Sequence, residues 1–400
     1  MERPVSSDIG ALPAGTGPRE HPGAAGRALR IFVSAGEASG DGILGAVLAR
    51  LREAATGLEL AGLGGPAAEA QGLRPLFPIA DTAFSGAWDV IARAPFALRL
   101  FRKTAQALRG FRPDLVLLVD YPGLNLRLAR LARSLGVPVH FIAPPQAWAY
   151  KDPARKLRQA RAALAGCSVQ PLFAFETADW RVPGIAVRAG HFLPALVPAA
   201  PKTGPCLICP GSRLPVLRRN LPAWLRLISK AGLTRADWAA AVPAFLETEA
   251  RELARRGGWP GLEILTGAAA NAALAAAPRA LAFPGTFTLE LARHRVPTLV
   301  MALIDPLTYA LGKRLLASRR LALPNLILDE DLFPEWAGTP PGPAPEVFRA
   351  LWEGLPGEGG IDWDGKLGAL EAKLGAGDGA DAAARICLGL TQSRSGTANP

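Results

Sequence analysis

A short turn near residue 285 carries the residue types of a phosphate and ribose site. An apolar run, a Pro-Gly turn and a helix-forming stretch follow one another between residues 280 and 294. Gly285 lets a ligand approach the backbone, and the first free N–H groups of the predicted helix face the same side as the hydroxyls of Thr286 and Thr288. A helix start of this kind binds phosphate, and Glu290 suits a ribose diol. The turn therefore predicts a nucleotide site, with an ordinary βαβ unit as the alternative.

A second turn, Gly211-Ser212-Arg213, also has the residue types of a phosphate site. It follows the short apolar run Cys206–Cys209, and a helix is predicted from about residue 216 to 230. The guanidinium of Arg213 can bridge two phosphoryl oxygens. This turn therefore predicts a contact with a diphosphate.

Asp120 is the acidic residue best placed for catalysis. It directly follows Leu115–Val119, the least ambiguous predicted strand. In an open α/β sheet, ligands bind at the carboxyl ends of the strands. An Asp in this position either caps the next helix or acts as a general base, and position alone does not decide between the two.

Two glycine-containing segments near the amino terminus differ from well-known phosphate motifs. Ser34–Asp41 follows the first predicted strand but lacks the Gly-Lys-Ser/Thr of a P-loop, and Ser39 is not in a Gly-x-Ser-x-Gly elbow. Residues 62–67 satisfy Gly-x-Gly-x-x-Ala, but they follow the second strand, not the first. Dinucleotide binding is therefore disfavoured.

The overall composition indicates a globular protein with an anionic partner. The chain has 400 residues, of which 50% are hydrophobic and 20% charged, and this length suggests two domains. Its net charge of +11 is consistent with nucleic acid, a membrane surface or a phosphorylated substrate. With three Tyr and no basic run interleaved with aromatic residues, nucleic acid is disfavoured.

The four cysteines and the amino-terminal segment bear on the compartment. Cys167, Cys206, Cys209 and Cys387 do not make a disulfide framework in a chain this long, which favours a reducing cytoplasm. The spacing of Cys206 and Cys209 matches a metal or redox motif, but core packing is favoured. Residues 1–28 lack the apolar core of a signal peptide and are predicted to be a disordered tail. The longest run of low charge, at 265–281, is interrupted, so no transmembrane helix is expected.

The elements that must position these residues form two βα series. In the first, strands are predicted at 29–33, 58–63, 115–119 and 137–142, with helices at 42–53 and 153–164. A Pro- and Ala-rich linker at 191–205 precedes the second series, with strands at 206–209, 239–242, 263–265, 281–283 and 298–301. Two such series predict an α/β protein of two Rossmann-like doubly wound domains that face each other across a cleft.

Residues 93–112 form a basic amphipathic segment. Arg99, Arg102, Lys103 and Arg109 lie among Phe96, Leu98, Leu100 and Phe101. One interpretation is a helix packed on its own sheet with solvated arginines. The other is contact with an anionic membrane surface.

Taken together, the motifs resemble the lipid-A-disaccharide synthases, which are inverting glycosyltransferases of the two-Rossmann (GT-B) architecture. The resemblance runs from about Ile31 to Leu328, and any one stretch is weak, but the ordered set is specific. The stretches are Ser34–Asp41, Gly64–Pro66, Asp120–Asn125, Trp148–Tyr150, Gly190-His191, Pro210–Arg213, Gly285–Glu290, Pro306–Tyr309 and Leu323–Asn325.

The resemblance implies a role for each matching residue. Asp120 is implied as the catalytic carboxylate. The implied nucleotide and diphosphate residues are Gly211, Ser212, Arg213, Gly285, Thr286, Thr288, Glu290 and Asn325. The implied substrate-site candidates are Ser39, Gly40, Asp41, Asn125, His191 and Tyr309.

The implied reaction transfers 2,3-diacylglucosamine from its UDP ester to 2,3-diacylglucosamine 1-phosphate. No metal or other cofactor is expected, since no His cluster suggests a divalent ion. Partners would be these two substrates and an anionic membrane, without nucleic acid, on the cytoplasmic side of the inner membrane. An oligomer is left open. The expected units are residues 29–200 for the acceptor and membrane, 201–355 for the nucleotide sugar, and 356–400 as a helical segment and tail.

Three positions depart from the family pattern. Gly123 and Ala195 stand where the family usually has Asp, and Val216 where it has Glu. Retention of Asp120 and Arg213 favours an active enzyme. The rival hypotheses are another GT-B UDP-sugar enzyme, either a transferase or an epimerase, and a catalytically silent paralogue that binds nucleotide sugar or membrane.

Overall fold

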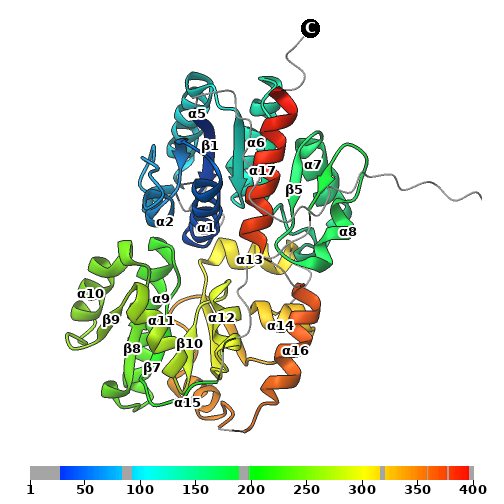
Figure 1. The fold of residues 1–400 in the computed structure, drawn as a ribbon. Coiled ribbons are helices and arrows are strands. Elements are labelled where there is room, and N and C mark those ends of the chain that lie inside the picture. The colour runs from blue at the N-terminus through cyan, green and yellow to red at the C-terminus, as the bar shows by residue number, and fades with distance from the viewer. Residues whose placement is uncertain are drawn as a thin grey trace, which may run out of the picture.

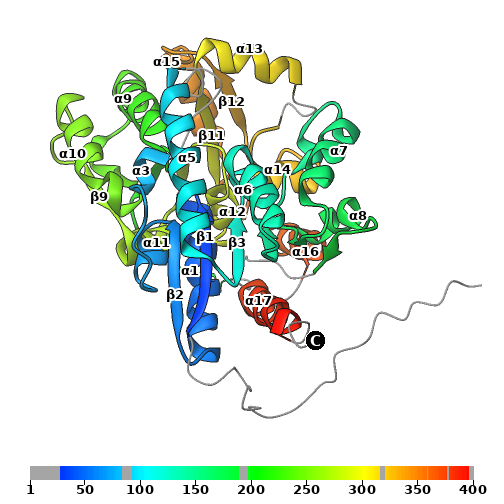
Figure 2. The ribbon, with the colours of Figure 1, turned by 90° about the horizontal axis from the view of Figure 1, so that it is seen from above.

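The chain forms two parallel six-stranded sheets, each with helices on its faces. A computed structural model describes residues 28–82, 92–188, 197, 199–315, 320–357, 359–375 and 378–395. The expected tail at 1–28 thus lies almost entirely outside the described residues. Figure 1 shows the first sheet above the second, and Figure 2 shows the same arrangement from above.

The first sheet has the strand order β2-β1-β3-β4-β5-β6, with all strands parallel. Its central strand β3 is buried along its whole length, because helices cover both faces of a parallel sheet. This explains its continuous apolar sequence, Leu-Val-Leu-Leu-Val. The strands are β1 (Leu29–Ala35), β2 (Leu58–Leu63), β3 (Leu115–Val119), β4 (Val139–Ile142), β5 (Ser168–Gln170) and β6 (Ala186–Val187).

The helices of this part of the chain lie between the strands in sequence. They are α1 (Ala38–Ala54), α2 (Pro66–Glu69), α3 (Ile79–Thr82), α5 (Ala94–Phe111), α6 (Pro122–Ser134), α7 (Pro153–Leu164) and α8 (Thr177–Trp180), with 3-10 turns η1 (Ala147–Ala149) and η2 (Ala174–Glu176). Helix α1 starts at Ala38, earlier than the predicted Gly42, because the extended backbone of Glu37 already ends the turn. Ser39, Gly40 and Asp41 are therefore helical residues and not loop residues.

The second sheet has the order β12-β11-β10-β7-β8-β9, also parallel. Its strands are β7 (Cys206–Cys209), β8 (Trp238–Ala241), β9 (Glu263–Leu265), β10 (Ala280–Ala282), β11 (Thr298–Leu303) and β12 (Glu335–Gly338). The helices and turns between them are α9 (Leu214–Lys230), η3 (Arg235–Asp237), η4 (Ala244–Leu246), α10 (Glu247–Arg256), α11 (Gly267–Ala276), α12 (Phe287–Arg293), α13 (Pro306–Leu315) and α14 (Leu323–Leu328).

Three further helices follow: α15 (Pro345–Glu353), α16 (Trp363–Leu374) and α17 (Gly379–Ser395). Helix α15 packs on α9 of the second sheet, and α16 packs on α14. Helix α17 returns to the first sheet and packs on α1, where Ala383, Ala384 and Cys387 are buried in the same cluster as Val33 and Leu117. Figure 1 shows α17 in red beside the first sheet and α16 in orange beside the second. The end of the chain therefore spans both units.

Each sheet has one topological switch point, which is the point where the strand order reverses direction. In the first sheet it lies between β1 and β3, and in the second between β7 and β10. Loops that leave the carboxyl ends of the two strands at such a point diverge to opposite faces and leave space for a ligand. The four loops concerned begin after Ala35, Val119, Cys209 and Ala282. These loops contain Glu37, Asp120, Arg213 and Gly285, so a ligand site is expected between them.

The predicted α/β architecture with two doubly wound sheets is confirmed. The predicted bounds of β2, β3, β7 and β9 match the observed bounds, whereas β5, β6 and β12 were not predicted. Among the described residues, no helix combines the length and apolar character needed to cross a bilayer.

Candidate active site

Asp120 lies at the carboxyl end of β3 in an unusual backbone conformation. Asp120 and Tyr121 have φ angles of 47° and 52°, in the left-handed region. Such conformations cost roughly 1–3 kcal/mol each and occur where the surrounding structure determines the position of a functional side chain. The N–H of Asp120 donates to the carbonyl of Ile142 at 2.9 Å, which ties the turn to β4. The residue that flanks α6 is Tyr121, which gives no side-chain cap, so the structure does not support the capping alternative for Asp120.

A buried amide holds this turn in place. The Nδ2 group of Asn125 donates to the carbonyl oxygens of Asp120 at 2.8 Å and of Ser34 and Val119 at 3.2 Å each. The Ser34 hydroxyl donates to Oδ1 of Asn125 at 2.6 Å. Both side chains are completely buried. Asn125 thus joins the ends of β1 and β3 and positions Asp120 instead of facing a ligand.

Burial, together with neighbouring charges, makes Asp120 a suitable base near neutral pH. Burial raises the pKa of its carboxyl to about 6, and the nearby Glu37 carboxylate adds to this rise. The Tyr121 backbone N–H and the Arg213 guanidinium act in the opposite direction. A carboxylate with a pKa raised in this way binds a proton more readily than an exposed Asp does.

Arg213, in the loop after β7, forms an ion pair with Glu37, in the loop after β1. Its Nη2 is 2.5 Å from Oε2 of Glu37, which is 176 residues away in the sequence. Glu37 lies within the motif Ser34–Asp41 but is not among the residues that the sequence predicts for the site. Its position in the first βα loop, one residue before a helix, is the signal that could have identified it.

Asp41 serves the structure of the first unit. Its carboxylate accepts hydrogen bonds from the N–H groups of Gly65 at 2.7 Å, Ala67 at 2.9 Å and Ala68 at 3.2 Å. These N–H groups form the start of α2, so the carboxylate occupies the place that a phosphate would take in a dinucleotide site. These three N–H groups of residues 62–68, where dinucleotide binding is disfavoured, are therefore bonded within the protein. Of the neighbouring candidates, Ser39 is exposed and Gly40 is buried.

The β7–α9 turn requires glycine and leaves its polar groups open. Gly211 has a φ of 106°, and a Cβ there would lie 2.7 Å from Cγ1 of Val216. Ser212 is exposed and Arg213 is partly exposed. Val216, the position where an acidic residue was expected, is buried in the first turn of α9.

The β10–α12 turn is also open at its tip. Gly285 and Thr286 are exposed, and a Cβ added to Gly285 would meet no atom within 4 Å. Thr288 differs, because it is completely buried. Its hydroxyl donates to the Gly285 carbonyl at 2.7 Å and accepts from the N–H of Leu323 at 3.2 Å. Thr288 therefore shapes the turn, while Gly285 and Thr286 are accessible to a ligand.

Glu290 lies one turn into α12 and pairs with Arg293, with 2.9 Å between Oε2 and Nη1. Burial raises the pKa of Glu290, and Arg293 opposes that rise. Its side chain is partly exposed, which leaves room for a ribose hydroxyl to reach the carboxylate.

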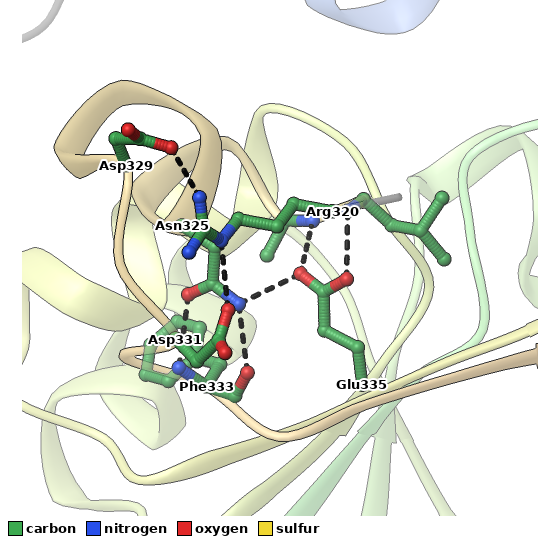
Figure 3. A network of polar contacts seen from close by, with 8 residues as sticks. Arg320, Asn325, Asp329, Asp331, Phe333 and Glu335 are labelled. Carbon is green, nitrogen blue, oxygen red and sulfur yellow. Dashed lines mark hydrogen bonds and ion pairs between the residues drawn. The ribbon is translucent and has the colours of Figure 1, made fainter. Parts of the chain in front are cut away.

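Asn325 is fully engaged within the protein, as Figure 3 shows. Its Nδ2 donates to the Phe333 carbonyl and to Oε1 of Glu335, both at 2.7 Å, and its Oδ1 accepts from the N–H of Phe333 at 2.9 Å. Glu335 also accepts from the N–H groups of Leu321 and Ala322. Since the next N–H, that of Leu323, bonds to Thr288, this network supports the Gly285 turn from behind. Asn325 is completely buried, so its contribution to nucleotide binding would be indirect.

Of the two remaining candidates, Tyr309 lies within the described residues and His191 does not. Tyr309 lies on α13, where its hydroxyl is 3.4 Å from the Ala337 carbonyl and the Lys313 ammonium is 4.5 Å from the ring centroid. The carbonyl of Lys313 accepts a hydrogen bond from Lys151 at 3.0 Å, which is another contact between the two halves of the chain. His191 and Ala195 lie outside the described residues.

Other acidic residues form ion pairs or cap a helix, and two of the cysteines are poorly suited to react. Asp329 and Asp331 both pair with Arg320, while Asp362 caps α16 and Asp364 pairs with Arg295. Within the described ranges, no group of three or more His, Cys, Asp or Glu residues could hold a metal ion. Burial raises the pKa of the Cys206 thiol to about 11 and that of Cys209 as well, opposite to what a reactive thiolate requires.

The basic segment at 93–112 forms helix α5. It packs inward through Leu100, Thr104, Ala105 and Leu108, while Leu98 is 46% exposed. Phe96 and Phe101 are only partly buried, but Phe96 packs edge-on to Phe77, and Arg127 lies over the ring of Phe101. The outward surface therefore combines Leu98 and Gln106 with basic side chains, and little aromatic area is available.

Comparison with known proteins gives consistent matches over most of the chain. A family model described as lipid-A-disaccharide synthetase matches residues 31–350. A lipid-A-disaccharide synthase from Ruegeria pomeroyi is 31% identical over 353 residues, covering 82% of this chain and 86% of that protein. One from Rhodospirillum centenum is 32% identical over 330 residues, covering 77% and 80% respectively.

Among solved structures, a protein described as a UDP-N-acetylglucosamine 2-epimerase from Listeria monocytogenes has a similar fold. It aligns with a TM-score of 0.51 and 13% identity, covering 94% of this chain and 98% of that one. At this identity the similarity concerns the fold alone.

Proposed function

Because the chain belongs to the lipid-A-disaccharide synthase family, we propose that it transfers 2,3-diacylglucosamine from its UDP ester to the 6-hydroxyl of 2,3-diacylglucosamine 1-phosphate. The protein is accordingly a glycosyltransferase. The products would be the β-1,6-linked disaccharide phosphate and UDP.

The chemistry needs two groups on opposite sides of the reacting carbon. The acceptor oxygen forms a bond to C1 of the donor sugar while the bond from C1 to the phosphate oxygen breaks. The proton of the acceptor hydroxyl goes to Asp120, and the bonding electrons leave with UDP. Arg213 and the backbone at Gly285 and Thr286 would stabilise the negative charge that grows on the leaving diphosphate.

One observation carries this assignment: Arg213, from the switch point of the second sheet, pairs with Glu37, from that of the first, and both charges act on the carboxyl of Asp120. A base from one unit and a cation from the other are what an acceptor and a nucleotide sugar held between the two units would require. Asn125 and Ser34 restrain the base, whereas Ser212 and Gly285 remain open to the donor.

The direct test is release of UDP by the purified protein. We expect release that depends on both UDP-diacylglucosamine and diacylglucosamine 1-phosphate, with formation of the disaccharide phosphate. UDP binding without turnover would identify a silent paralogue. Interconversion of a UDP-sugar without an acceptor would identify an epimerase.

We assign acceptor and membrane contacts to residues 29–200 and the nucleotide sugar to residues 201–355. Both substrates carry acyl chains, so the protein must work at a bilayer surface, which we place at the cytoplasmic face of the inner membrane. Helix α5 is suited to this contact because Arg99, Arg102 and Lys103 are exposed next to Leu98. Each basic residue near an anionic surface contributes about 1 kcal/mol, to which shallow insertion of Leu98 would add.

This contact predicts salt-sensitive binding to vesicles with anionic lipids. Changing Arg99, Arg102 and Lys103 to Glu should strongly reduce co-sedimentation at low ionic strength, because attraction becomes repulsion. A matched control changes Arg226, Lys230 and Arg256, which are exposed on α9 and α10, to Glu. If both triple variants bind as the wild type does, α5 is only a helix packed on its sheet.

A further inference from the structure

The Glu37–Arg213 ion pair is placed where the donor's diphosphate would bind. Glu37 belongs to the loop after β1 and Arg213 to the loop after β7, so the pair joins the switch points of the two sheets. The two charged atoms are 2.5 Å apart, and the side chains are 18% and 34% exposed, respectively. The Glu37 and Arg213 side chains therefore form a close ion pair that solvent can still reach.

The contact is not needed to build either unit. Asp41 and Asn125 each make several hydrogen bonds at the carboxyl ends of the strands in the first sheet. Gly211 sets the backbone of the β7–α9 turn in the second sheet. The Glu37 side chain makes no cap for the helix that follows it. Within the described chain the Glu37 carboxylate accepts a hydrogen bond from Arg213, so its role lies between the units.

A carboxylate at this position conflicts with a diphosphate. Arg213 uses its Nη2 to bind Glu37, and a two-bond contact with phosphoryl oxygens that includes Nη2 would compete with this bond. In addition, the diphosphate would place negative charge beside Glu37, with Arg213 as the cation between them.

We propose that Glu37 is a positioning residue that holds Arg213 in the nucleotide-free protein and releases it to the diphosphate of the donor or of UDP. This proposal rests on the proposed function, because it assigns Arg213 to the diphosphate. It adds a residue and a step: donor binding exchanges one anion for another on the same guanidinium. Since the exchange breaks a bond between the units, it also links donor binding to their relative position.

The same exchange acts on Asp120. The charged side chains that affect the pKa of Asp120 are Glu37, from the β1–α1 loop, and Arg213, from the β7–α9 loop. On its own element the Tyr121 backbone N–H faces the carboxyl, and the neighbouring β4 contributes a backbone contact through Ile142. When Arg213 moves to the diphosphate, Asp120 keeps the influence of Glu37 and becomes a stronger base after the donor is bound.

The test measures UDP binding by calorimetry for the full-length wild type and for Glu37→Gln. Gln keeps the shape of the side chain and removes its charge, so Arg213 is free from the start. The dissociation constant of UDP should fall about five-fold, the scale of a partly exposed ion pair. Glu249→Gln is the control, since Glu249 pairs with Arg218 at 2.6 Å outside the four switch-point loops and should leave UDP binding unchanged.

A double variant separates exchange from simple repulsion. In an Arg213→Gln background, Glu37→Gln should no longer tighten UDP binding, because the guanidinium being released is absent. Tightening of the same size in that background would overturn the exchange. So would an unchanged or weaker affinity in the single variant, with thermal melting showing that it is folded.

A pH profile gives a readout that a purely structural role would not change. Asp120 must be ionised to accept a proton, so wild-type kcat/KM should rise as the pH passes through about 6. Without the Glu37 charge the acidic limb should move to lower pH; an unmoved limb counts against the proposal. Wild-type protein that binds no UDP would refute the proposed function and the inference with it, whereas UDP binding with no effect of Glu37→Gln refutes only the inference.

Discussion

At the switch point of the first sheet, the polar side chains of Asp41 and Asn125 are buried and bonded to the backbone of their own unit. At the switch point of the second sheet, Ser212 and Thr286 are exposed. Both regions have the same topology, with two parallel strands whose connections diverge. The same kind of loop thus serves two purposes. Buried polar groups support the fold of their own unit, and exposed polar groups are available to a ligand.

The difference follows from what each edge must hold. A base has to sit at a defined distance from a reacting atom, so the first edge restrains Asp120 through a rigid network. A nucleotide brings many acceptors of its own, so the second edge needs free donors and a backbone that a ligand can approach. Thr288 and Asn325 are exceptions in the second unit, because both are buried and support the Gly285 turn from within.

The largest effect should come from removing the base at the first edge. Asp120→Asn keeps the size of the side chain but cannot take a proton, so turnover should fall roughly 10²-fold or more. UDP affinity and the melting temperature should remain close to those of the wild type. Steady-state kinetics with both substrates, together with calorimetry, will show this. Unchanged turnover would remove Asp120 as the base.

At the second edge, the expected loss is in binding. Arg213→Ala should raise the dissociation constant of UDP by about tenfold or more, because a charge-assisted hydrogen bond contributes about 1.5–3 kcal/mol. Arg213→Lys should restore only part of the affinity, since an ammonium lacks the planar fork. An alanine variant that binds UDP and turns over normally would contradict the assignment and remove the contrast between the edges.

A third change tests whether the buried polar groups at the switch point of the first sheet stabilise the folded protein. Asp41→Ala leaves three N–H groups without their acceptor and should lower the free energy of unfolding by about 2 kcal/mol. Ser39→Ala, two residues earlier and exposed, is the matched control and should change stability little. Urea denaturation measures both. Equal stability of the two variants would mean that burial at this edge is a poor guide to function.

The smallest expected effect is that of a chelator. If Arg213 and the Gly285 turn stabilise the diphosphate, activity should survive excess EDTA within the error of the assay. Loss of activity that a divalent ion restores would show that a metal supplies the positive charge at the second edge.

Much of the architecture could be predicted because its signals are local. A parallel strand covered on both faces must be apolar throughout, as Leu115–Val119 is, and its bounds can be read from that run. Strand β6 has two residues, Ala186 and Val187, at the edge of the sheet, and β5 contains Ser168 and Gln170. Neither has a run long enough to distinguish a strand from a loop.

The candidate site could be predicted in part. Asp120 and Arg213 follow strands directly, so the chain order alone places them at carboxyl edges. Sequence patterns could not separate Thr286 from Thr288, two residues apart, of which one is exposed and the other buried. Burial of a side chain depends on what packs over it, and for Thr288 that is residue 323 in another segment.

The sequence by itself determined the two βα series, the turns at their switch points and the excess of basic charge, since periodicity, glycine positions and composition are properties of neighbouring residues. The tertiary structure decided which polar side chains are hydrogen-bonded within the protein. It also decided that Glu37 pairs with Arg213 and that α17 returns to the first sheet. These outcomes depend on hydrogen bonds and packing between segments far apart in the chain, and such contacts exist only once both sheets have formed.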